Sequence, residues 1–206
     1  MVAGVDRPGG DPLLHPLARQ RRRRLRLHGR RLTAGLGGRL PTLDHLSEIS
    51  IVRLHQADWA ACREIRLAGL AEAPSAFGAD VAREEAMTPA DWRARLTRRS
   101  TFAASAPHGL VGTAAGIRGD VAGHAELVGM WVHPDWRCRG IGGLLVDAVI
   151  AWAAAGPFRA LDLWLSVGND PAEALYAHHG FVRTGATQPV REDAPTLLEL
   201  EMTRPL

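Results

Sequence analysis

The chain has 206 residues, of which 46% are hydrophobic, so it is long and apolar enough for one folded domain with a substantial core or, at most, two small domains. All 25 Lys and Arg positions are arginines. Together with the abundance of alanine and glycine, this indicates a bias in nucleotide composition rather than selection for arginine chemistry. Two cysteines, Cys62 and Cys138, argue against a disulfide framework or a zinc site, and a reduced cytoplasmic setting is expected. The nine histidines show no metal-ligand spacing, and no apolar run approaches the roughly 20 residues of a membrane span.

Charge is distributed unevenly along the chain. Residues 1–47 hold ten Arg and three Asp, a net charge of +7, whereas residues 48–206 hold fifteen Arg and nineteen acidic residues, a net charge of −4. The basic character therefore belongs to the N-terminal segment, which disfavours nucleic acid as a partner of the body. We predict that residues 1–47 form a disordered, Arg-rich extension, because they cannot bury enough apolar area to offset their ordering entropy. Contact of this extension with an acidic surface is the alternative.

The folded domain is predicted to occupy residues 48–206, beginning with a strand at Ile51–Leu54. Asp58 can cap a helix from Trp59 to about Ala71, and Pro74, Ser75 and Gly78 then break it. The sequence Thr88-Pro89-Ala90-Asp91 is typical of a helix start, with a threonine cap and proline in the first turn. That helix is expected to end near Arg98. Three strands of a meander follow, at 101–106, 110–117 and 124–133, separated by turns.

A second helix–strand succession completes the chain. Apolar residues at helical spacing predict a helix from Ile141 that Gly156-Pro157 ends. A strand at 161–167 comes next, and Asp170 is expected to cap a short helix ending at Gly180. The last strands are expected at 181–184 and 197–202, with a loop at 184–195 between them. The whole is an α+β body. The helical stripe from Ile141 comprises Ile141, Leu144, Leu145, Ala148, Val149 and Trp152.

The segment Arg137–Gly143 reads Arg-Cys-Arg-Gly-Ile-Gly-Gly and lies between a predicted strand and a predicted helix. Small glycines there allow backbone amides to surround an anion, and the helix N-terminus adds unpaired N–H groups. A phosphate-bearing ligand is therefore predicted. A P-loop is excluded because the chain has no lysine, and a dinucleotide fingerprint would come early in a parallel βαβ repeat rather than after a meander.

The run Trp131-Val-His-Pro134, followed by Arg137-x-x-Gly140-x-Gly142, resembles the acyl-CoA motif of the GNAT N-acetyltransferase superfamily. The resemblance extends over about residues 49–206. It implies a GNAT fold: a central, mostly antiparallel mixed sheet, flanked by helices and splayed at the acyl-CoA strand. Further residues that carry it are Arg66-Leu67, Ala73-Pro74, Phe77-Gly78, Glu84-Glu85, Asn169, Tyr176 and Gly180-Phe181.

The resemblance implies acetyl-CoA as the cosubstrate. The backbone amides of about Cys138 to Gly143 would bind its pyrophosphate, and Gly140 and Gly142 would allow the close approach. Cys138 stands where glycine is common in the family and is expected to be tolerated at negative φ. Asn169 would hydrogen-bond the cofactor. The remaining implied cofactor residues are the phosphate-facing Arg137 and Arg139, the amide of Ile141, the amide of Gly143, and the pantetheine-facing strand Met130, Trp131 and Val132.

The implied activity is transfer of an acetyl group from acetyl-CoA to a primary amine. In the family a tyrosine protonates the leaving sulfur, and here this is Tyr176. Glu126 is the favoured base, acting through a water, because strand alternation places it on the face of Val128 and Met130; His133 is a weaker candidate.

Two other readings of the function stay open: a non-catalytic acyl-CoA-binding module, and a nucleic-acid binder acting through the basic extension. The acceptor would be held by the N-terminal helices and the loop at 184–195. Its identity is open between small-molecule amines, amino acids, polyamine-like compounds, antibiotics and protein N-termini, and a homodimer is also open.

Overall fold

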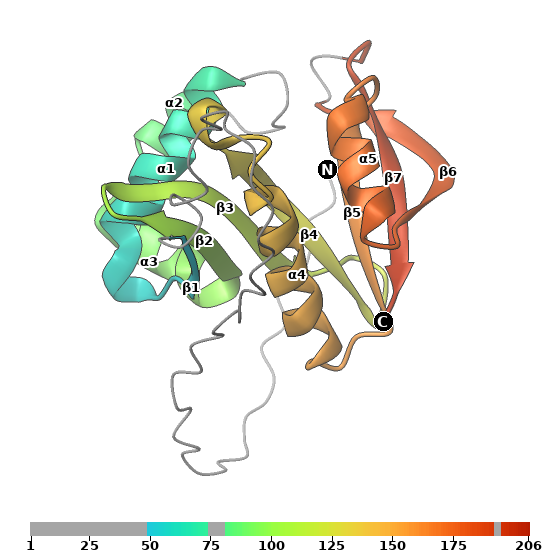
Figure 1. Cartoon of the computed structure of the whole chain (residues 1–206), viewed down its shortest axis with the longest axis horizontal. Helices are drawn as coiled ribbons and strands as arrows, with labels where there is room; N and C mark the ends of the chain where they lie inside the picture. The colour runs from blue at the N-terminus through green and yellow to red at the C-terminus, as the bar shows by residue number, and fades with distance from the viewer. Residues whose placement is uncertain (1–48, 74–80, 192–194) are drawn as a thin grey trace, which may run out of the picture. The chain divides into compact units, whose positions relative to one another are not determined.

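The computed structural model describes residues 49–73, 81–191 and 195–206 (Figure 1). The predicted N-terminal extension and the predicted helix breakers Pro74, Ser75 and Gly78 lie outside these ranges. Within them, no helix is both long and apolar enough to cross a membrane. No group of three or more His, Cys, Asp or Glu side chains in the same ranges is placed to hold a metal ion.

One seven-stranded sheet organises the described residues, in the order β1-β2-β3-β4-β5-β7-β6. Every neighbouring pair is antiparallel except β4 and β5, which are parallel. The predicted mostly antiparallel mixed sheet is therefore confirmed. The strands are β1 (Ser50–Arg53), β2 (Ser100–Ala106), β3 (Gly109–Arg118), β4 (His124–Val132), β5 (Ala160–Ser166), β6 (Val182–Pro189) and β7 (Leu198–Pro205).

Helices cover both faces of the sheet and bury two separate apolar clusters. The smaller cluster, around Cys62, Trp92 and Ala103, joins the sheet to α1 and α3. The larger cluster includes Leu145 and Tyr176 and joins the other face to α4 and α5. The helices are α1 (Trp59–Glu72), the short α2 (Val81–Glu85), α3 (Pro89–Arg98), α4 (Ile141–Ala154) and α5 (Asp170–His178).

The sheet splits between β4 and β5. Their parallel register runs only from His124 opposite Ala160 to Glu126 opposite Asp162, although β4 continues to Val132 and β5 to Ser166. Beyond that short register the two strands diverge as a V (Figure 1). The predicted splay at this strand is confirmed, and the edge of β4 that faces β5 is not paired with it from Leu127 onward.

A bulge lies at the middle of β4. Thr113 of β3 is opposite Trp131, but Ala115 is opposite Val128, so two residues of β4 oppose one residue of β3. The extra residue is accommodated at Gly129, whose φ is +63°, a left-handed conformation that favours glycine.

The bulge exchanges the two faces of β4. Leu127, before the bulge, and Met130, after it, both pack against the larger cluster beneath α4. Glu126 alternates with Leu127 and therefore lies on the opposite face. The expectation that Glu126 and Met130 share a face is wrong, because it assumed unbroken alternation along the strand.

Two helix starts differ from the sequence prediction and one agrees. Thr88 caps α3 with a reciprocal bond to Asp91, as predicted. Asp58 does not cap α1, because its carboxylate accepts from the backbone N–H of His55 at 2.8 Å. Asn169, not Asp170, caps α5, with its side-chain oxygen accepting from the N–H of Ala172 at 3.3 Å.

Two surface assignments are also corrected. Leu144 is 41% exposed, whereas Val146 and Ala153 of the same helix are buried, so the buried stripe of α4 is rotated relative to the predicted one. The region predicted as a loop at 184–195 begins inside β6, a strand whose residues are all exposed. An exposed strand lacks the alternation of polar and apolar residues that identifies most strands.

Candidate active site

A cleft of about 640 Å³ lies where β4 and β5 separate. Four of the residues predicted from the sequence line it: Glu126 and Met130 from β4, Asn169 before α5, and Tyr176 within α5. Trp131, Val132 and the segment 137–143 lie outside its walls, in the stretch that continues from the end of β4 into α4. His133 is likewise outside the walls, in the turn after β4.

Tyr176 is positioned by the core. Its ring packs edge-on against Phe181, with centroids 5.8 Å apart, and only 5% of the residue is exposed. Burial raises the pKa of Tyr176 well above its usual value, so the phenol keeps its proton at neutral pH. Among the described residues its hydroxyl has no hydrogen-bond partner, although the residue lines the cleft. This arrangement suits a proton donor.

Glu126 enters the cleft where the splay begins, opposite Asp162. Burial raises the pKa of Glu126, and the negative charges of Asp120, Glu199 and Asp162 raise it further, in that order, with Arg99 opposing them. A carboxylate with a raised pKa is a stronger base than an exposed one, which is the property that proton abstraction from an amine requires.

The segment before α4 has the backbone of an anion site. Cys138 and Gly140 have φ values of +58° and +76°, and residues in this left-handed region can turn neighbouring amides toward a common point. No side chain of the described residues caps α4, and the N–H groups of its first turn have no partners within the helix. The features predicted for a phosphate site are therefore present, whereas binding itself stays a prediction.

Cys138 does not meet the condition under which the sequence leads us to expect it to be tolerated, a negative φ. It is the only residue other than glycine with a positive φ in the described ranges. The left-handed turn into α4 imposes this geometry, and a Cβ in it costs about 1–2 kcal/mol. The common glycine at this motif position therefore has a conformational reason as well as a steric one.

Arg137 is engaged by protein groups that the sequence did not reveal. Its Nη2 donates to Glu72 at 2.8 Å and its Nε to the carbonyl of Val132 at 3.0 Å. The indole N–H of Trp131 donates to the same Glu72 carboxylate at 3.0 Å. These contacts tie the end of α1 to the end of β4, and they lower the pKa of Glu72, the Arg137 bond most strongly.

The other members of the motif have distinct surroundings. Arg139 lies over the ring of Trp136 at 5.0 Å. A Cβ on Gly142 would come within 3.1 Å of Leu175 Cδ2 and 3.4 Å of Met130 Cε, two side chains that line the cleft. Gly142 therefore permits close packing of α4 on α5, a role additional to the ligand approach expected from the sequence.

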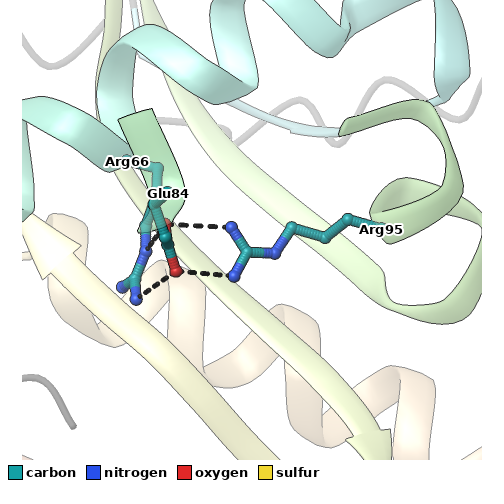
Figure 2. Close-up of polar contacts among 3 residues, drawn as sticks. All are labelled: Arg66, Glu84 and Arg95. Atoms are coloured by element: carbon teal, nitrogen blue, oxygen red, sulfur yellow. Dashed lines mark hydrogen bonds and ion pairs between the residues drawn. The ribbon is translucent and has the colours of Figure 1, made fainter. Parts of the chain in front are cut away.

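A buried ion cluster lies beside the cleft, and the sequence did not predict that its members contact one another. Figure 2 shows Glu84 of α2 between Arg66 of α1 and Arg95 of α3. Four hydrogen bonds of 2.7–3.1 Å join the three side chains. Burial alone would raise the pKa of Glu84, but the bonds from Arg95 and Arg66 outweigh it and hold the pKa at about 2. Helical spacing carries no signal for such contacts between helices.

Comparison with known proteins matches this architecture to acetyltransferases. The acetyltransferase of the GNAT family from Streptococcus pneumoniae is 20% identical, with a TM-score of 0.66 over 77% of this chain and 99% of that one. The yncA protein of Salmonella typhimurium, solved with its cofactor acetyl-CoA, is 20% identical with a TM-score of 0.60 over 77% of this chain and 94% of that one. The split sheet is thus the fold of the N-acetyltransferases.

The sequence places the chain within that class. The model of the acetyltransferase (GNAT) family matches residues 59–181, and the chain belongs to this family. An uncharacterized N-acetyltransferase of Methanocaldococcus jannaschii is 39% identical over 57 residues. That match spans 28% of this chain and a quarter (25%) of the relative's length. The family resemblance seen in the sequence is confirmed.

Proposed function

We propose that this protein transfers an acetyl group from acetyl-CoA to a primary amine by direct attack. The observation that carries the proposal is the cleft at the β4–β5 splay, which brings together a buried phenol and a carboxylate of raised pKa. Sequence and topology place these two groups on different elements, and only the splay gives them a common space.

The residues around the cleft fit acetyl-CoA. The left-handed backbone at Cys138 and Gly140 and the N-terminus of α4 offer amides to a pyrophosphate. The edge of β4 that is not paired with β5 from Leu127 onward offers backbone groups to an extended amide-bearing chain. The side-chain oxygen of Asn169 caps α5, so its amide N–H groups would be the ones that face the ligand.

Acetyl-CoA supplies an activated thioester, so the chain must bind, orient and move protons. Glu126 accepts a proton from the incoming ammonium, directly or through one water, and leaves the amine neutral for attack on the carbonyl carbon. A C–N bond forms and the C–S bond breaks. Tyr176 gives its proton to the departing sulfur and regains one from the newly formed amide nitrogen or from solvent. The balance is acetylated amine, CoA thiol and one released proton.

The proposal is tested by incubating the full chain with acetyl-CoA and a panel of primary amines. The readout is release of free CoA thiol together with mass detection of the acetylated amine. We expect transfer to at least one acceptor class. Tight acetyl-CoA binding without transfer to any amine would support the alternative of a non-catalytic binding module.

Glu126→Gln is expected to lower kcat/KM about 100-fold at neutral pH, because the amide cannot accept the proton. In the wild type, the pKa reported by the acidic limb of the profile of kcat/KM against pH should lie above the usual glutamate range, because burial and nearby carboxylates raise the pKa of Glu126. Activity is then lost as the pH falls through that raised pKa. The measurement is kcat/KM against pH for both proteins.

The same experiment has a built-in control. Glu126→Asp keeps a carboxylate and should retain an acidic limb with a smaller loss of rate. If Glu126→Gln kept a wild-type rate and an unchanged profile, another group would be the base.

A further inference from the structure

The acidic wall of the cleft comes from β5 and β7. Their register sets Asp162 opposite Thr203, Trp164 opposite Glu201 and Ser166 opposite Glu199. Leu163, Leu200 and Met202 alternate with these residues and lie in the core under α4 and α5. Asp162, Glu199 and Glu201 therefore share the other face of the sheet, the one that also carries Glu126, and all four line the cleft.

These carboxylates give one side of the cleft a negative field. Burial raises the pKa of Glu199, with the hydrogen bond from Gln188 opposing it. Glu201 accepts from Thr184 at 2.7 Å, and Asp162 accepts from Thr203 and contacts His124 Nδ1 at 2.6 Å. Such a wall favours a cationic amine and draws it toward Glu126.

Arg99 is a contrasting, positively charged group among the residues that line the cleft. It follows directly after α3 and lines the cleft together with Arg66 of α1. Its side chain is half-buried, and no hydrogen bond or ion pair to it is found among the described residues. The nearby carboxylate of Glu84 is already shared by Arg66 and Arg95. Burial, followed by the charges of Arg95 and Arg66, lowers the pKa of Arg99.

A half-buried guanidinium without a carboxylate partner is costly unless a ligand supplies the anion. Arg99 is also close enough to Glu126 for its charge to act on that carboxylate. The walls of the cleft thus offer a cation for an anionic group and carboxylates for an amine.

Building on the proposed function, we propose that the amine acceptor is a small zwitterion of the α-amino acid type. Arg99 binds its carboxylate through paired N–H donors, and the acidic wall holds its ammonium group beside Glu126. Arg99 is then a specificity-determining residue that positions the acceptor and takes no part in proton transfer.

The test compares each of the nineteen protein amino acids that carry a primary α-amine with the amine that lacks the α-carboxylate, using acetyl-CoA as donor. For the preferred side chain, we expect the wild type to favour the amino acid at least tenfold in kcat/KM. Arg99→Met should bring this ratio close to one, mainly by raising KM for the amino acid. Arg99→Lys, which keeps the charge but loses the paired donors, should give an intermediate ratio.

The matched control is Arg98→Met, the same change at the exposed neighbouring residue, which should keep the wild-type ratio. A wild-type ratio of one or below, or equal losses for both members of a pair in Arg99→Met, would overturn the inference. Calorimetric titration with CoA distinguishes failure of the zwitterionic-acceptor inference from failure of the proposed function. CoA binding without acetylation of any amino acid overturns the zwitterionic acceptor, whereas absence of CoA binding overturns the proposed function itself.

Discussion

Replacing Tyr176 with phenylalanine is expected to lower kcat about 100-fold, because the departing sulfur then loses its proton donor. The fold tolerates the change. The ring packs against Phe181 through its edge, and the hydroxyl makes no hydrogen bond among the described residues, so Phe keeps the packing and leaves no partner unpaired. The loss should therefore appear in turnover rather than in stability.

Two measurements make the Tyr176→Phe result specific. The dissociation constant for acetyl-CoA should stay within about twofold of the wild type, and the thermal midpoint should stay within a few degrees. A turnover rate equal to that of the wild type would remove Tyr176 from the mechanism. A large loss of acetyl-CoA affinity would instead assign it a binding role.

Replacing Glu84 with glutamine is expected to destabilise the fold by about 3 kcal/mol. Glu84 is 5% exposed and joins α2 to both α1 and α3 through two paired arginine contacts (Figure 2). Glutamine keeps the shape but removes the negative charge from between two partly buried guanidinium groups. A loss of this size corresponds to a fall of about 6–12 °C in the thermal midpoint of a domain of this length. The matched control is Glu85→Gln, an exposed neighbour, which should change stability by less than about 0.5 kcal/mol.

The Glu84 contribution should also depend on pH with a definite sign. The folded pKa is about 2, against an ordinary value of 4.5. A lowered folded pKa means that the stabilisation is fully present above pH 4.5 and is lost as the pH falls toward 2. Urea unfolding at several pH values should show the wild type and Glu84→Gln converging across this window. A constant difference between them down to pH 2 would contradict the ion-cluster account.

Local signals in the sequence were sufficient to predict the strand–loop–helix unit that contains the motif Arg137–Gly143. The predicted strand at 124–133 and the helix from Ile141 correspond to β4 and α4, because an apolar strand, a glycine-rich turn and a helical stripe are each recognisable within a few residues. The same holds for α3, whose Thr88–Asp91 cap is entirely local. The splay came from the family resemblance and not from any local pattern.

Contacts between distant segments were not predictable in this way. The bulge at Gly129 changed the face on which Met130 lies, and it is fixed by pairing with β3 rather than by the sequence of β4. Glu72 binds Arg137 across 65 positions, and no periodicity indicates it. Arg99 lies between a helix and a strand, where sequence patterns say little, and the role proposed for it rests on its place in the cleft and on the lack of a hydrogen-bond or ion-pair partner among the described residues.

The most direct test of the account is a crystal structure of the full chain with acetyl-CoA. We predict that the pyrophosphate accepts hydrogen bonds from backbone amides between Cys138 and Gly143. The thioester should lie between β4 and β5, with its sulfur within hydrogen-bond distance of the Tyr176 hydroxyl and its carbonyl carbon open to the face that carries Glu126. A pyrophosphate bound elsewhere, or a thioester outside the β4–β5 cleft, would contradict the assignment of this cleft as the acetyl-transfer site.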